Sequence, residues 1–209
     1  MVITYYGASC FKVQSGETVL VFNPPSKDSE FKSPRFQANM VLLSYNHKDF
    51  NGWDNLSGKK EGGAPFIIDG PGEYEIGGIY VKGLATGRND LEQGINTVYA
   101  VSVEDISLCH LGAANEKELG AEITEDIGEI DILFTPIGGE NVLDSTMASH
   151  IISQLEPKIA IPSHYKEADL KKFQKEFGNG PIKPVDKLTI KKKDLGEQKA
   201  EIVVLEPMI

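Results

Sequence analysis

The order of apolar segments along the chain constrains its fold more than any other feature of the sequence. Short apolar runs dominate the first half, at residues 2–6, 10–13, 18–22, 40–43, 66–68, 79–81, 97–103 and 106–109. Apolar residues at helical spacing occur only later, at residues 119–127, 147–155 and 170–177. Strand-like runs lie between and after them, at residues 132–135, 158–161 and 202–205. The chain thus begins with a series of strands and continues with strands that alternate with helices. This order predicts an α/β (α+β) protein in which two β-sheets pack together with helices outside.

Length and charge narrow the classes of protein that the chain can belong to. Its 209 residues predict one domain over residues 1–209, since no repeat or linker divides them. A formal net charge of −10 disfavours binding to nucleic acid or to an anionic membrane surface. No apolar run approaches the ~18 residues that a membrane-spanning helix needs. Cys10 and Cys109 are too few for a disulfide framework. We therefore predict a cytoplasmic protein with no nucleic-acid or membrane partner.

Three of the four histidines share one position relative to the predicted strands. His47 follows the run at 40–43, His110 follows the run at 106–109, and His164 follows the run at 158–161. Functional sites in α/β folds gather where loops leave the carboxyl ends of strands, so these side chains are expected to converge. Asp49 lies two residues after His47 and can reach the same space. His150 lies on the polar side of a predicted helix and is expected at the surface.

Two interpretations of these side chains stay open at this point. Imidazole nitrogens and carboxylate oxygens are the usual ligands of zinc, and a catalytic zinc needs three of them and an open position. Alternatively, each histidine ends its strand by bonding to a loop carbonyl and has no chemical role. Residue types and spacing alone do not decide between a metal site and strand capping.

Seven short motifs carry a resemblance to a known family. They lie at residues 6–11 (Tyr-Gly-Ala-Ser-Cys-Phe), 22–24 (Phe-Asn-Pro), 44–51 (Ser-Tyr-Asn-His-Lys-Asp-Phe-Asn), 69–76 (Asp-Gly-Pro-Gly-Glu-Tyr-Glu-Ile), 109–113 (Cys-His-Leu-Gly-Ala), 136–139 (Pro-Ile-Gly-Gly) and 156–165 (Glu-Pro-Lys-Ile-Ala-Ile-Pro-Ser-His-Tyr). In this combination the sequence resembles the metallo-β-lactamase fold, in the branch of small bacterial metal-dependent hydrolases related to ascorbate lactonases. The resemblance implies a four-layer αββα sandwich of two mixed sheets flanked by helices, with a dinuclear metal site at one edge.

The chain departs from that family at several ligand positions. The family's signature loop reads His-x-His-x-Asp-His, and a later His-x-Gly-Asp supplies a further histidine and the carboxylate that bridges both metals. By this resemblance, four positions keep a residue of ligand type: His47, Asp49, His110 and His164. Three do not: Tyr45, Phe50 and Ala113. Each half of the implied site retains two ligands, and the methyl side chain of Ala113 cannot bridge the two metal ions.

These departures lead to two predictions of function. The first is a pseudoenzyme, a hydrolase-like domain that has lost the dinuclear centre, carries no cofactor, and binds an unidentified small molecule or protein. The alternative is a hydrolase with one zinc or other divalent ion held by His47, Asp49, His110 and His164, in which Asp49 is catalytic only when the metal is bound. Whether the chain is an enzyme depends on which of the two holds.

Overall fold

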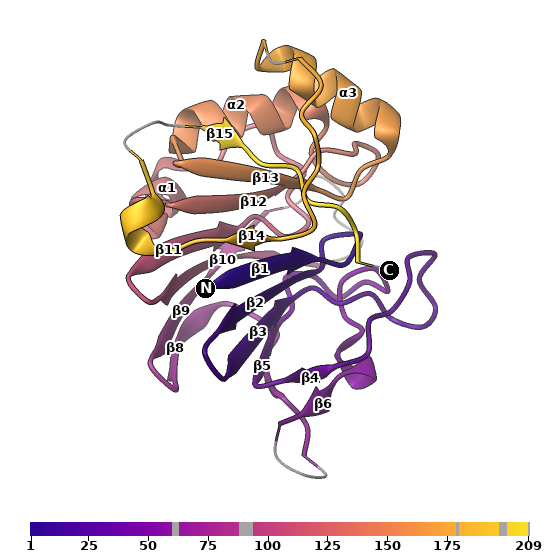
Figure 1. Ribbon diagram of the computed structural model, residues 1–209, viewed down its shortest axis with the longest axis vertical. Coiled ribbons are helices and arrows are strands. Elements are labelled where there is room, and N and C mark those ends of the chain that lie inside the picture. Colours follow the sequence, from indigo (N-terminus) through magenta and orange to yellow (C-terminus); the bar gives the residue numbers. More distant parts are fainter. Residues whose placement is uncertain (60–62, 88–93, 179, 197–199, 209) are drawn as a thin grey trace.

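Two mixed β-sheets stacked face to face form the frame of the protein in a computed structural model (Figure 1). The structure describes residues 1–59, 63–87, 94–178, 180–196 and 200–208. The six-stranded sheet has the order β14 (Leu188–Thr189), β1 (Val2–Tyr5), β2 (Phe11–Ser15), β3 (Thr18–Phe22), β5 (Met40–Leu42) and β7 (Phe66–Ile68). The seven-stranded sheet has the order β15 (Glu201–Ile202), β13 (Ile159–Ser163), β12 (Ile132–Pro136), β11 (Ile106–His110), β10 (Asn96–Val103), β9 (Ile79–Thr86) and β8 (Gly72–Ile76).

Each sheet combines antiparallel and parallel strand pairs. Strands β1 to β3 form an antiparallel meander, after which β5 and β7 run parallel to β3. Strands β8 to β11 are antiparallel, after which β12, β13 and β15 run parallel to β11. The fold predicted from the order of apolar segments, two mixed sheets with helices outside, is confirmed.

Successive side chains of a strand point to opposite faces of its sheet. In the larger sheet, one set is buried between the two sheets and the other set is buried on the outer face. On β10, Tyr99 and Val101 face the six-stranded sheet, whereas Val98 faces the helices. Aromatic rings join the sheets, with the centroids of Phe11 on β2 and Phe134 on β12 4.5 Å apart. Burial of this apolar surface is the main force that holds the two sheets together.

The three α-helices found among the described residues lie beside the seven-stranded sheet (Figure 1). They are α1 (Ala121–Ile127), α2 (Ser145–Leu155) and α3 (Glu167–Glu176), and each falls in a region where helical spacing predicts a helix. Helix α2 begins at Asp144, whose side chain accepts a hydrogen bond from the backbone N–H of Met147 at 2.9 Å. Ile151 and Leu155 on α2 are buried against the sheet, and His150 is exposed as predicted.

The outer face of the six-stranded sheet has a different cover within the described residues. Side chains of β3 and β5 pack there against Ala38 and Leu56, which belong to a segment with the strand pair β4 (Gln37–Ala38) and β6 (Ser57–Gly58) and the 3₁₀ helix η1 (Trp53–Asn55). A second 3₁₀ helix, η2 (Lys192–Asp194), precedes β15. The apolar pattern does not predict β4, β6, β8 or β14. Three of them have only two residues each, and β8 is an edge strand that exposes Glu73 and Glu75.

The parallel strands determine where a site can form. Because β11, β12 and β13 run in one direction, their carboxyl ends meet at one edge, where His110 ends β11 and His164 follows β13. The loop that follows β5 brings residues 44–51 to the same region, since Thr97 at the start of β10 donates a hydrogen bond to the carbonyl of Ser44. No helix in the described part of the chain is long and apolar enough to cross a membrane.

Candidate functional site

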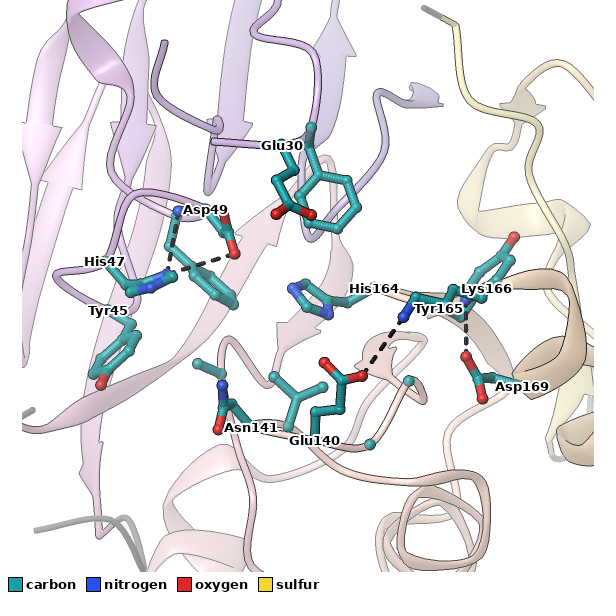
Figure 2. Close-up of a pocket in the computed structure, with 16 residues that line it drawn as sticks. Glu30, Tyr45, His47, Asp49, Glu140, Asn141, His164, Tyr165, Lys166 and Asp169 are labelled. Carbon is teal, nitrogen blue, oxygen red and sulfur yellow. Dashed lines mark hydrogen bonds and ion pairs between the residues drawn. The ribbon is translucent and has the colours of Figure 1, made fainter. Parts of the chain in front are cut away.

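A pocket of about 400 Å³ opens at this edge of the two sheets (Figure 2). Its lining comes from residues 30–31 before β4, from the loop after β5, from Ala113 after β11, from residues 138–142 after β12 and from residues 164–166 and 169 after β13. His47, Asp49 and His164 all line the pocket, so the structure brings together three of the four residues predicted to converge.

His47 and Asp49 face each other across a tight turn. The backbone N–H groups of Phe50 and Asn51 both donate to the carbonyl of His47, which closes the turn. His47 Nδ1 lies 3.6 Å from Asp49 Oδ2 and 3.3 Å from the backbone nitrogen of Asp49. Ser29 Oγ donates to Asp49 Oδ1 at 2.6 Å, which anchors the carboxylate from the other side. The imidazole and the carboxylate are therefore oriented before any ligand binds.

The backbone of His164 is held in an uncommon conformation. Its φ angle is +49°, in the left-handed region that few side chains adopt without support. Its N–H donates to the carbonyl of Ala8 at 2.6 Å and to Tyr5 Oη at 3.2 Å. A Cβ atom at Gly138 would overlap the carbonyl oxygen of His164, so only glycine allows this close approach. Three segments thus fix the position of a single histidine.

The ring of His164 lies between two phenylalanines. Phe50 stacks on it with centroids 5.6 Å apart, and the Phe31 ring lies 5.3 Å away at a tilt of 54°. The Nε2 atom is buried and makes no hydrogen bond. Burial lowers the pKa of His164, and the attraction of nearby Asp49 opposes this only in part. The ring is therefore favoured in its neutral form, and its buried Nε2 is left without a hydrogen-bond partner.

His110 does not belong to this pocket, and the prediction that it joins the other three residues is wrong. It is fully buried between the sheets, where its ring stacks on Phe22 and Phe134 with centroids 4.8 and 5.6 Å away. Gly112 N–H donates to Nδ1 at 2.9 Å, which places the proton of the neutral ring on Nε2, 3.1 Å from the Ser9 carbonyl. Burial lowers the pKa of His110 to about 3. For this histidine the strand-capping interpretation holds.

The three positions at which the family resemblance implies lost ligands lie together on the pocket wall. Tyr45, Phe50 and Ala113 form a buried apolar cluster with Val142. None of the four supplies an imidazole or a carboxylate, so the described residues do not fit a centre of two bridged metal ions. They fit a single ion by donor chemistry, since His47, Asp49 and the unsatisfied Nε2 of His164 share one pocket. No three such side chains of the described chain stand in a ready metal-binding geometry, so binding requires some adjustment of side chains.

Several residues of the pocket are not predicted from the sequence. Glu30 and Phe31 come from a polar connection, and Glu140 and Lys166 come from loops. Loop residues carry no periodic pattern, so no sequence signal assigns them to the site. Lys166 Nζ lies 3.5 Å from Glu140 Oε1 at the pocket rim.

The fold and the pocket define a two-sheet domain with histidine and carboxylate side chains at its edge. Residues 2–164 match the protein family described as "Beta-lactamase superfamily domain", and the chain belongs to this family. A UPF0173 protein of Pyrococcus furiosus is 26% identical and covers 85% of this chain and 90% of its own length. A UPF0173 metal-dependent hydrolase of Natranaerobius thermophilus is 24% identical and covers 99% of this chain and 97% of its own.

Solved structures show the same architecture. A protein of Thermotoga maritima from the metallo-β-lactamase superfamily, proposed as a Zn-dependent hydrolase, aligns with a TM-score of 0.79 and 28% identity over 98% of this chain and 99% of its own. The metallo hydrolase Igni18 of Ignicoccus hospitalis aligns with a TM-score of 0.66 over 99% of this chain and 95% of its own. Its 18% identity supports the fold alone.

Proposed function

We propose that the chain is a hydrolase that depends on one divalent metal ion, held by His47, Asp49 and His164. The observation that carries the proposal is the buried Nε2 atom of His164, which has no hydrogen-bond partner and lies in the same pocket as the His47–Asp49 pair. A buried polar atom without a partner is costly, and a ligand that satisfies it recovers this cost. Relatives named as metal-dependent hydrolases support the same conclusion.

The surrounding residues prepare this donor set. A bound divalent ion would supply a Lewis acid and lower the pKa of water. Ser29 orients the carboxylate of Asp49, and the rings of Phe31 and Phe50 fix the plane of His164 and exclude water from its faces. Two imidazoles and one carboxylate are the donors that catalytic zinc uses, with one position left for water or substrate. His110, which the sequence places in the set, is excluded by its burial.

A second candidate is a protein that binds a small molecule in this pocket without hydrolysing it. The apolar cluster of Tyr45, Phe50, Ala113 and Val142 favours it, because it covers a wall of the pocket with side chains that supply no imidazole or carboxylate. The adjustment needed to bring His47, Asp49 and His164 around one ion points the same way.

Zinc titration of protein prepared with a chelator separates the two candidates. The hydrolase requires about one tightly bound zinc per chain, measured by calorimetry and by elemental analysis. His47→Ala and His164→Ala should each abolish that binding, while His150→Ala, which removes an exposed histidine on α2, should leave it unchanged. Hydrolysis of a panel of small esters, lactones and amides should follow zinc occupancy. Absence of binding of zinc and of other divalent metal ions at millimolar concentration would reject the hydrolase, and zinc binding without turnover would favour the second candidate.

A further inference from the structure

The pocket of the proposed hydrolase carries far more negative than positive charge. Among its described lining residues, carboxylates come from Glu30, Asp49, Glu140 and Asp169, and the ammonium group of Lys166 is the only Lys or Arg side chain. The chain as a whole has a formal net charge of −10, which adds to the negative potential at the mouth.

Two of these carboxylates are available to a ligand. Glu30 makes no hydrogen bond or ion pair within the described part of the chain, and Figure 2 shows its carboxylate and that of Glu140 turned toward the space around His164 from opposite sides. Glu140 contacts Lys166 at 3.5 Å, but both side chains are largely exposed, and such a pair contributes little. Asp169 is not available, because its Oδ2 accepts the backbone N–H of Lys166 at the start of α3.

Aromatic rings supply the rest of the surface. Phe31, Tyr45 and Phe50 line the pocket beside these carboxylates, and Phe31 and Phe50 flank the ring of His164. The faces of aromatic rings attract cations, and the attraction grows where water is excluded. When no metal ion is bound, carboxylates combined with aromatic walls therefore favour an organic cation, and these carboxylates repel phosphate or carboxylate groups.

The size of the pocket and the state of His164 show that this surface is built to receive a molecule. A cavity of about 400 Å³ lies within the range of small-molecule sites. The Nε2 atom of His164 is buried in the same pocket without a hydrogen-bond partner. An acidic patch on an open surface would provide neither feature.

We infer that the substrate or ligand of this pocket is a small organic cation, an amine with an attached apolar group, which the carboxylates of Glu30 and Glu140 and the surrounding aromatic rings recognise. The inference rests on the proposed function, since it names the substrate class of the same pocket. The ammonium group would lie between the two carboxylates, and the apolar group would lie against Phe31 and Phe50.

A series of three probes of similar shape and different charge tests the inference: 2-phenylethylammonium, 2-phenylethanol and 3-phenylpropionate. Binding is measured by calorimetry or ligand-observed NMR, with a chelator and again with zinc. In the chelator, the ammonium probe should bind at least about tenfold more tightly than the carboxylate probe, and higher salt should reduce the difference. Glu30→Gln and Glu140→Gln should each weaken the ammonium probe about two- to fivefold and leave the alcohol unchanged. Glu125→Gln, which removes the same charge from exposed Glu125 on α1, is the matched control.

Each possible result bears on the inference. Equal affinity for the three probes, preference for the carboxylate, or no binding of the ammonium probe at about 10 mM would overturn it. An equal loss of affinity in Glu125→Gln would also overturn it, since the preference would then come from net charge and not from the pocket. Zinc binding without charge preference would leave the proposed hydrolase intact. Charge preference in the chelator without zinc binding would support the inference and reject the hydrolase.

Discussion

His164 and Phe50 stack nearly parallel, with ring centroids 5.6 Å apart and 13° between their planes. His164 follows the last long strand of one sheet, and Phe50 comes from the loop after β5 of the other sheet. The stack therefore joins the two sheets at the mouth of the pocket and fixes the orientation of the unsatisfied Nε2. Phe50 also belongs to the apolar cluster with Ala113, so one ring shapes both walls of the site.

The approach of Gly138 to His164 leads to the first prediction. Gly138→Ala should lower the midpoint of thermal unfolding by several degrees and weaken ligand or metal binding, because the new methyl group overlaps the carbonyl oxygen of His164. The displaced backbone would lose the hydrogen bond from His164 N–H to Ala8. Thermal unfolding and zinc titration of the purified variant measure both effects.

Gly120→Ala provides the control for this substitution. Gly120 precedes α1, and a Cβ atom there has no heavy atom within 4 Å. This variant should keep the pocket intact and change stability by no more than about 1 kcal/mol. Wild-type stability and zinc affinity in Gly138→Ala would show that the loop around His164 tolerates displacement.

The second prediction concerns acid sensitivity. In the unfolded chain His110 has its ordinary pKa of 6.5, whereas burial lowers the pKa in the folded protein to about 3. Between these values the unfolded state binds more protons, so the free energy of unfolding falls as pH falls from 6.5 toward 3. The slope from this group is at most about 1.4 kcal/mol per pH unit. Above pH 6.5 its contribution is complete and constant.

His110→Gln should reduce the slope of the free energy of unfolding against pH below pH 6.5, because the titrating group is gone. Urea unfolding at a series of pH values measures the slope independently of the overall loss of stability, which is expected since Gly112 and Ser9 lose their ring partners. His150→Gln, at an exposed position on α2, should keep the wild-type slope. If the His110→Gln slope equals that of the wild type, proton uptake by His110 does not drive acid unfolding.

His110 also shows what the sequence could and could not predict. Its place at the end of an apolar run was predicted correctly, but the direction of its side chain was not. Alternation along β11 contains the missing signal: Leu108 faces the core between the sheets, so His110, two residues later, faces it too, while Cys109 faces the helices. For His47 and His164, which lie in loops beyond their strands, alternation does not apply, and the position at the strand end placed them in the pocket.

Glu30 and Glu140 are pocket residues that the sequence does not predict. Both are exposed residues in connections, where side-chain identity follows neither helical nor strand spacing. Their convergence on His164 depends on how the two sheets pack, which is set by contacts between residues distant in the sequence. Main-chain architecture could be predicted because alternating burial repeats along many strands, whereas each loop residue of the pocket occurs only once.

The third prediction tests the anchoring of Asp49. Ser29 Oγ donates to Asp49 Oδ1 at 2.6 Å and accepts the backbone N–H of Phe31 at 3.0 Å. Ser29→Ala should therefore lower zinc affinity about tenfold, because partners that orient a metal ligand typically contribute that much. Ser33→Ala is the control, since the buried hydroxyl of Ser33 makes no hydrogen bond and its removal should cost nothing. A similar zinc affinity in both variants would mean that the hydrogen bond from Ser29 does not orient a ligand of the ion.

The last prediction adds donors to the apolar wall of the pocket. Phe50→His and Ala113→Asp together introduce an imidazole and a carboxylate next to Asp49 and His164, so zinc affinity should rise by more than the sum of the two single effects. Without metal, the double variant should be less stable than the parent by a few kcal/mol, because a buried ring is lost and a carboxylate is placed among Tyr45 and Val142. Excess zinc should restore the lost stability by mass action, since it binds the folded site. Thermal unfolding with and without zinc measures both effects, and Phe66→His, at a half-exposed phenylalanine on edge strand β7, controls for the added histidine. A folded double variant whose unfolding temperature does not respond to zinc would show that these positions no longer face a common point, and would favour the non-catalytic candidate.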